Sequence, residues 1–97
     1  MATYIMLNKF TQQGSQNIKD IPKRIEENRP RFMKMGAELK SWHLTMGAYD
    51  AVVIVEAPND EVIAKLAMAI CGQGMAQTHT MRAFTLEEFK TLTSQLP

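Results

Sequence analysis

The chain has 97 residues, of which 45% are hydrophobic and 22% charged, with a formal net charge of +1 at pH 7. This composition is that of an ordinary globular protein and excludes a disordered or fibrous chain. The near balance of acidic and basic side chains argues against nucleic acid or an anionic membrane as the main partner. We expect one domain over residues 1–97. Because so short a chain buries little of its surface, we also expect oligomerisation to add to that burial.

The cysteine content and hydropathy of the chain indicate its compartment. Cys71 is the only cysteine, so no internal disulfide can form and no metal site is expected. It lies in an apolar run, where we expect a buried, protonated thiol and not a reactive one. No stretch has the pattern of a signal peptide or the length of a membrane-spanning helix. We therefore expect a cytoplasmic protein without a membrane partner.

The first third of the chain predicts a strand followed by a helix. Residues 3–10 are rich in aromatic and branched side chains and predict a strand, which ends at the polar cluster of residues 11–15. From Ile18 onward, apolar residues recur at helical spacing and predict an amphipathic helix that ends at Gly36. Pro22 is tolerated only in the first turn of a helix, so we expect the helix to begin at Asp20 or Ile21. Pro30 lies inside this pattern, so we expect it to kink or break the helix.

The middle of the chain predicts two adjacent strands. Residues 38–46 alternate in polarity, and we expect Trp42, Leu44 and Met46 to face the helices. Residues 50–57 are almost all apolar and predict a strand at the centre of the sheet, buried on both faces. The short connection between the two strands favours an antiparallel hairpin.

The last part of the chain predicts a helix, a strand and a further helix. The turn at residues 58–60 caps a helix over residues 61–71, and residues 75–84 alternate again as a strand. Thr85 and Glu88 have the spacing of a capping box, which predicts the start of a terminal helix. The apolar positions of that helix are Leu86, Phe89, Leu92 and Leu96.

The order of these elements is the split βαβ pattern of an α+β fold, with an extra C-terminal helix. Right-handed crossovers place both crossover helices on one face of the four-stranded sheet and leave the other face bare. A large bare apolar face is rare on a monomer. We therefore expect two copies to pack face to face. A homodimer is the smallest assembly that we expect. A larger homo-oligomer is also possible, because the terminal helix can dock either on its own sheet or on a neighbouring copy.

Residues 44–50, followed by 53–61, resemble the GYD domain family, named for a signature carried here by Gly47, Tyr49 and Asp50. Similar segments occur at residues 17–24 and 80–84. The resemblance implies a ferredoxin-like fold of the dimeric α+β barrel group and brings no settled activity. More distantly, that group includes cofactor-free monooxygenases, small-molecule isomerases and haem enzymes, whose activities would come to this chain by fold analogy alone.

The alternation of the strands suggests which side chains face the interior of such a barrel. On the second strand, His43 and Thr45 lie on the face opposite to that of Trp42, and we expect them to point into the barrel. The first strand turns either the set of Tyr4, Met6, Asn8 and Phe10 or the opposite set toward this interior, and we take Asn8 as its candidate. On the last strand we assign Arg82, Thr78 and Thr80 to the interior. The expected ligand pocket therefore contains His43, Asn8 and Arg82. By the same alternation, we expect Leu39 and Ser41 to lie on the same side of the second strand as His43.

Several candidate residues have more than one interpretation. His43 has a pKa range suited to a general base or an axial haem ligand, but it can equally be a hydrogen-bonded packing residue. His79 follows a glycine-rich turn and is either exposed or a second candidate ligand for haem. Arg82 can hold an anionic ligand, or form a structural ion pair with Asp50 or Glu56.

The signature residues also allow two interpretations. In a purely structural role, Gly47 adopts a positive φ, Asp50 accepts hydrogen bonds from turn amides, and Tyr49 covers the end of the barrel. In a functional role, the Tyr49 hydroxyl and the Asp50 carboxylate line the barrel mouth and orient a small ligand or donate a proton.

Three functional hypotheses follow, and whether the chain catalyses any reaction stays open. The first is a homo-oligomer that binds a small molecule or has a structural role, because the sequence holds no metal-ligand cluster or nucleophile with a base. The second is a cofactor-free enzyme for a small metabolite, with His43 or Tyr49 as proton carrier and Arg82 as anchor. The third is a haem-binding barrel with His43 or His79 as axial ligand.

Overall fold

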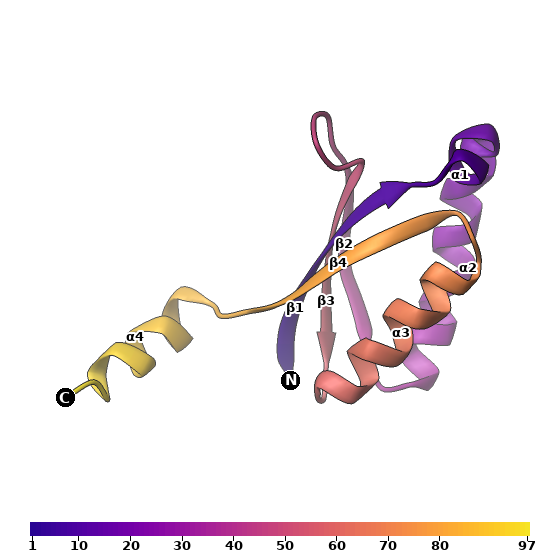
Figure 1. Cartoon of the computed structure of the whole chain (residues 1–97). Helices are drawn as coiled ribbons and strands as arrows, with labels where there is room; N and C mark the ends of the chain where they lie inside the picture. Colours follow the sequence, from indigo (N-terminus) through magenta and orange to yellow (C-terminus); the bar gives the residue numbers. More distant parts are fainter.

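The structure, a computed structural model, describes all 97 residues. The predicted order of strands and helices is confirmed (Figure 1). Short helical turns, which were not predicted, precede the first long helix. The elements are β1 (Ala2–Phe10), α1 (Gln12–Gln16), the 3-10 helix η1 (Ile18–Asp20), α2 (Ile21–Lys34), β2 (Glu38–Leu44), β3 (Ala51–Ala57), α3 (Asp60–Gly72), β4 (Ala76–Ala83) and α4 (Leu86–Ser94).

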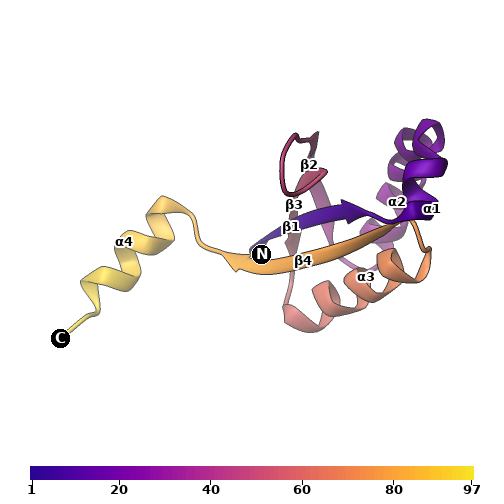
Figure 2. The same cartoon turned by 45° about the horizontal axis from the view of Figure 1, so that its top comes forward.

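The four strands form one antiparallel sheet in the order β2-β3-β1-β4. Helices α2 and α3 both lie on the same face of this sheet, as Figures 1 and 2 show, and no element covers the other face. The predicted ferredoxin-like α+β fold is therefore confirmed. The predicted central position of β3 is also confirmed, although β3 is fully buried only on its helix face.

The core lies between the sheet and the two helices. Alternate side chains of the central strands are buried there, with Tyr4 and Met6 from β1 and Val53 and Val55 from β3. Helix α2 contributes Phe32, while α3 contributes Ile63 and Leu66. Because successive side chains of a strand point to opposite faces, the residues between these buried ones face solvent on the other side of the sheet.

Helix α2 continues through Pro30 to Lys34, so the break considered at Pro30 does not occur. A proline within a helix removes one backbone hydrogen bond. Ile25 and Phe32, which flank Pro30, both pack on the core, and their burial holds the helix in place across the lost bond. The helix begins at Ile21, as expected from Pro22 in its first turn, and η1 forms a separate turn before it.

Helix α3 begins where predicted, because the Asn59 side chain accepts a hydrogen bond from the Val62 backbone N–H at 3.0 Å. The expected burial of Cys71 is wrong, since this residue is exposed. The buried stripe of α3 contains Ile63 and Leu66, and Ile70 continues it. Cys71 comes one position later, about 100° further round the helix. It therefore lies outside the buried stripe, at an exposed position where its Sγ atom is 3.8 Å from Thr78 Oγ1 of β4.

Helix α4 projects away from the rest of the molecule (Figure 1), and none of its residues is buried. The capping box predicted at its start is confirmed, with both Thr85–Glu88 hydrogen bonds present. The radius of gyration is 14.6 Å, whereas a compact domain of this length has about 12.5 Å. The projecting helix thus makes the chain elongated. None of the helices combines the length and the hydrophobicity of a transmembrane span.

Candidate functional site

The uncovered face of the sheet has an apolar centre. Residues paired across neighbouring strands share a face, and the registers place Ile5 and Leu7 of β1 beside Ile54 and Val52 of β3. Met81 of β4 pairs with Ile5 and is 45% exposed. We call these five residues the apolar face: Ile5, Leu7, Val52, Ile54 and Met81.

One row across this face carries a histidine at each end. His43 pairs with Val52, Val52 pairs with Leu7, and Leu7 pairs with His79. The predicted direction of His43 is therefore confirmed, and both histidines are exposed. Three strand spacings separate them, or about 14 Å. The two imidazoles therefore lie at opposite edges of this face, with Leu7 and Val52 between them. No cluster of three or more histidine, cysteine or acidic side chains lies close enough together to hold a metal ion.

Strand β2 follows the predicted alternation only in part. A bulge between Leu39 and Ser41 shifts the register, so Leu39 pairs with Val55 and is buried on the helix side. The expectation that Leu39 shares a face with His43 is therefore wrong, because one extra residue in a strand reverses the side on which its neighbours lie. Met46 follows the end of the strand and is 98% exposed, so it does not pack against the helices as expected.

Asn8 and Arg82 lie on the face opposite to His43, so the predicted pocket of these three residues does not form. Arg82 pairs with Tyr4, and Asn8 pairs with Thr78, which places them all on the helix side. The alternation of β4 correctly predicted that Thr78, Thr80 and Arg82 share one face. It could not show which of the two faces lies under the helices. Thr80 is on the helix side as well.

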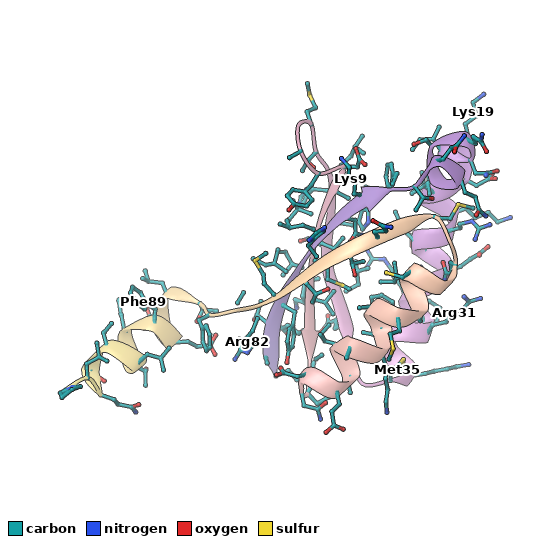
Figure 3. The ribbon with its side chains drawn as sticks, in the orientation of Figure 1. Lys9, Lys19, Arg31, Met35, Arg82 and Phe89 are labelled. Carbon is teal, nitrogen blue, oxygen red and sulfur yellow. The ribbon has the colours of Figure 1, made fainter.

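Arg82 has a structural environment. Its guanidinium lies over the rings of Tyr4 and Phe84, at 5.7 Å and 4.3 Å from the ring centroids. It forms an ion pair with Glu88 at 3.5 Å, not with Asp50 or Glu56 as considered. It also donates to the Thr3 and Ala83 carbonyl oxygens. These contacts hold the start of the linker to α4, which Figure 3 shows leaving the sheet beside Arg82.

The loop that carries the family signature is held by hydrogen bonds. The Thr45 hydroxyl donates to the Tyr49 carbonyl at 2.7 Å, and the Thr45 amide donates to the Asp50 carbonyl at 2.8 Å. The Asp50 carboxylate accepts from the Phe10 amide at 2.7 Å. Gly47 has a φ of 107°, the left-handed conformation that glycine tolerates best. Thr45, Gly47 and Asp50 therefore shape the loop.

Tyr49 reaches the opposite edge of the sheet from the strand that precedes it. Its ring meets the His79 ring edge to face, with centroids 5.4 Å apart and an interplanar angle of 72°. Lys9 donates to the Ala48 carbonyl at 3.3 Å, which ties the same loop to β1. The loop thus closes one end of the apolar face. Sequence reasoning did not find the pair of Tyr49 and His79, because contacts across four strands leave no local signal.

Two ionisable groups have shifted pKa values, and both lie outside the apolar face. The hydrogen bond that Tyr4 donates to Asp60 raises the pKa of the Tyr4 hydroxyl, and burial adds to this effect. The Thr85 backbone amide lowers the pKa of Glu88 by donating to its carboxylate, and Arg82 contributes to the same shift. Both groups therefore belong to contacts that hold elements together.

Comparison with known proteins identifies relatives of this chain. The profile of the GYD domain family matches residues 4–93. A protein of Thermus thermophilus, called glutamine synthetase and cystathionine beta-lyase binding protein, is 27% identical over 89 residues. The matched region covers 91% of this chain and 94% of that relative. No solved structure matches the chain significantly.

Proposed function

Since the chain belongs to the GYD domain family, we propose that it is a homo-oligomeric binding protein of one domain that docks on a metabolic enzyme. The observation that carries the proposal is a pair of unpartnered apolar surfaces in one small chain. These are the apolar face of the sheet and the apolar stripe of α4. A protein whose role is binding needs no catalytic constellation, and surfaces of this kind suit association.

The first support comes from the sheet. The apolar face occupies the centre of an uncovered layer, where Leu7 and Val52 are only half-buried. Exposed apolar patches of this kind on small proteins mark sites of association. A second copy is the occupant we propose, because two identical twisted sheets are complementary in shape and would form the barrel expected for this fold.

The second support comes from α4. This helix has nine residues, and isolated helices shorter than about 12 residues are marginal in water. Its apolar side chains Phe89 and Leu92 are 57% and 46% exposed, so its own chain does not stabilise it by packing. In Figure 1 it points away from its own sheet, which favours docking on a neighbouring copy over folding back.

The third support comes from the relative. The Thermus protein is described as binding glutamine synthetase and cystathionine beta-lyase. We propose that this chain binds an enzyme of one of these two kinds. We assign to such a partner the exposed rim of the sheet where Tyr49 and His79 meet beside Lys9, because this rim borders the apolar face at its β4 edge and lies outside its centre.

Self-association and enzyme binding are tested separately. Sedimentation at micromolar concentration is expected to give a dimer or a larger oligomer, and Ile54→Glu is expected to give a monomer because it places a charge in the apolar face. Ala64→Glu, on the exposed side of α3, is the matched control and should leave the mass unchanged. A stable monomer of the unmodified chain would refute the oligomer.

Enzyme binding is tested by co-elution of the purified chain with glutamine synthetase, and separately with cystathionine beta-lyase, from its own organism. One stoichiometric complex is expected. Lys9→Glu and His79→Ala at the free rim should weaken it while leaving the mass of the oligomer unchanged. The partner proposal fails if neither enzyme co-elutes with the unmodified chain, and this result leaves the sedimentation test unaffected.

A cofactor-free enzyme is the second candidate, favoured by the contact between Tyr49 and His79. A phenol and an imidazole in contact can move a proton to or from a bound molecule. In that case His79, and not Arg82, is the partner of Tyr49. Screening the chain with small carbonyl and phenolic compounds tests this candidate, and turnover that survives both Tyr49→Phe and His79→Ala would exclude the pair.

A further inference from the structure

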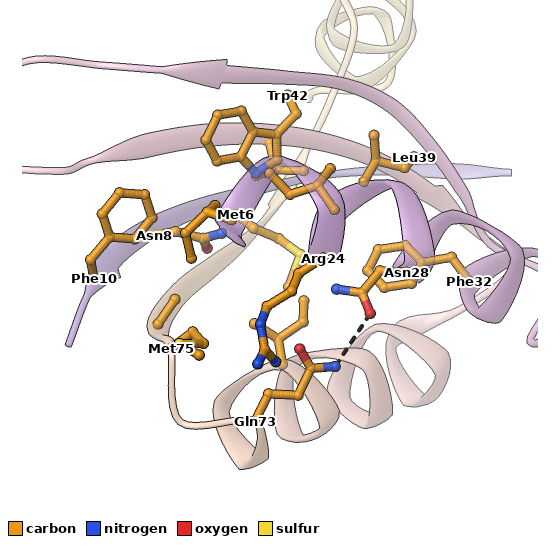
Figure 4. A pocket seen from close by; sticks show the side chains of 15 residues that line it. Met6, Asn8, Phe10, Arg24, Asn28, Phe32, Leu39, Trp42, Gln73 and Met75 are labelled. Atoms are coloured by element: carbon orange, nitrogen blue, oxygen red, sulfur yellow. Dashed lines mark hydrogen bonds between the residues drawn. The ribbon is translucent and has the colours of Figure 1, made fainter. Parts of the chain in front are cut away.

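A small cavity lies on the helix side of the sheet, away from the apolar face. Its volume is about 60 Å³, and 11 of its 15 lining residues are hydrophobic. Figure 4 shows it between the sheet, α2 and the C-terminal end of α3, with Trp42 and Met6 among its walls. Small-molecule sites are commonly apolar cavities with a few polar groups, of about 300–1,000 Å³. This cavity has that lining but is smaller, so it suits only a small ligand.

The first polar group in the cavity is Asn8. Its side chain is only 7% exposed, and its Oδ1 atom has no hydrogen-bond partner. A buried polar atom without a partner costs about 1–3 kcal/mol, and such atoms are rare in native proteins. The amide is therefore available to a bound molecule, toward which rotation about its last torsion can present either the oxygen or the nitrogen.

The second polar group is Arg24 of α2. It is half-buried and forms neither an ion pair nor a hydrogen bond, whereas Arg29 on the same helix pairs with Glu26 at 3.6 Å. Figure 4 shows the Arg24 side chain extending toward the end of α3 that carries Gln73. An unpaired guanidinium beside an apolar cavity is suited to a carboxylate, which it can bind through two parallel hydrogen bonds.

A contact between the helices fixes the width of the cavity. The Gln73 side-chain amide donates to Asn28 Oδ1 at 3.3 Å, which joins the end of α3 to the middle of α2. Both residues line the cavity, so the hydrogen bond spans the same gap that Arg24 crosses. This hydrogen bond therefore sets the separation of the two helices beside Arg24.

We propose that this cavity binds a small aliphatic carboxylate whose far end carries a hydrogen-bonding group. The carboxylate binds Arg24, the aliphatic chain lies against the apolar wall, and the far end meets the amide of Asn8. A volume of about 60 Å³ holds roughly four to six water-sized groups, which sets the length of the enclosed chain. The site and the apolar face lie on opposite sides of the sheet, so either can exist without the other.

The fluorescence of Trp42 provides a direct test, because it is the only tryptophan of the chain and it lines the cavity. The probe is 5-hydroxypentanoate, compared with pentanoate, which lacks the far hydroxyl, and with 1,5-pentanediol, which lacks the charge. A saturable fluorescence change is expected, strongest for the hydroxy acid. The diol should bind at least about tenfold more weakly, which corresponds to one charge-assisted hydrogen bond.

Two variants assign the two polar groups. Arg24→Gln is expected to weaken 5-hydroxypentanoate binding at least about tenfold, while Arg31→Gln, which changes an exposed arginine of the same helix, is the matched control and should not alter binding. Asn8→Leu should remove the preference for the hydroxy acid over pentanoate and keep pentanoate binding. A circular dichroism spectrum equal to that of the unmodified chain shows that each variant is folded.

Three results would overturn the proposal. The first is no saturable change with 4-hydroxybutanoate, 5-hydroxypentanoate or 6-hydroxyhexanoate at millimolar concentration, which means that the cavity holds water only. The second is equal binding of the diol and the acids. The third is an unchanged affinity in a folded Arg24→Gln chain. None of them bears on the mass of the oligomer, so they leave the association with a second copy to its own test.

Discussion

The Tyr4 hydroxyl donates a hydrogen bond to Asp60 Oδ1 at 2.5 Å and so ties the central strand β1 to the first turn of α3. Tyr4 is only 2% exposed, and its phenol would have no other partner. Tyr4→Phe is therefore expected to lower the free energy of unfolding by about 1–2 kcal/mol. Urea denaturation measures this change. Tyr49→Phe, at a half-buried tyrosine, is the matched control with an expected change near zero, and equal effects of the two substitutions would contradict the assignment.

The same contact predicts how stability changes at alkaline pH. The pKa of Tyr4 is raised in the folded state by the hydrogen bond to Asp60 and by burial. The folded state thus binds this proton more tightly than the unfolded state does, and the stabilisation is complete below the ordinary tyrosine pKa of about 10. It is lost as the pH rises through the folded-state value. In a Tyr49→Phe chain, absorbance at alkaline pH reports Tyr4 alone, and ionisation at or below the ordinary value would refute the shift.

Gly14 allows close contact between α1 and the residues that precede β4. A Cβ atom at this position would overlap the Met75 carbonyl oxygen, which already accepts a hydrogen bond from the Thr11 amide at 3.1 Å. Gly14→Ala is expected to destabilise the chain by about 1–3 kcal/mol, because backbone atoms must move apart. Gly72→Ala is the control, since no atom lies within 4 Å of the position that its added methyl group would take, and alanine favours a helix. Thermal unfolding of both variants measures the difference.

The element order was predictable because its signals are local. The capping box of Thr85 and Glu88 and the Asn59 cap each involve residues three positions apart, and the structure contains all of these contacts. A hydrogen bond between near neighbours forms whatever the rest of the chain does. The fold class followed from this order together with the handedness of the crossovers.

The face of each strand was less predictable. Alternation divides the side chains of a strand into two sets, but only pairing with other strands shows which set lies under the helices. His79 and Met81 of β4 lie on the open face, and Arg82 does not. The bulge beside Leu39 also has no sequence signal. The cavity beside Asn8 was not foreseen because its walls come from several separate elements.

Glu88 predicts a dependence of α4 on acidic pH. Its pKa is lowered, first by the hydrogen bond from the Thr85 backbone and then by Arg82. A carboxyl group with a lowered folded-state pKa stabilises the structure above its ordinary pKa, and this contribution is lost as the pH falls through the folded value. The NMR shift of the Glu88 carboxyl carbon against pH measures the titration. Thr85→Pro, which removes the donating backbone N–H at a residue whose φ of −67° proline can adopt, should move it toward the ordinary glutamate range. An unmoved titration would exclude this hydrogen bond as the cause.

Phe89 of α4 tests the proposed packing of this helix on a second copy. Figure 3 shows its side chain on the projecting helix, away from the sheet of its own chain. If α4 docks on a neighbour, Phe89→Glu places a charge in that contact and is expected to raise the dissociation constant of the oligomer at least about tenfold. The unfolding of a chain kept monomeric by Ile54→Glu should not change, because Phe89 is 57% exposed there. Thr91→Glu, at an exposed polar position of the same helix, is the control. An unaltered dissociation constant for Phe89→Glu would show that α4 takes no part in self-association, and the apolar face would then be the whole interface.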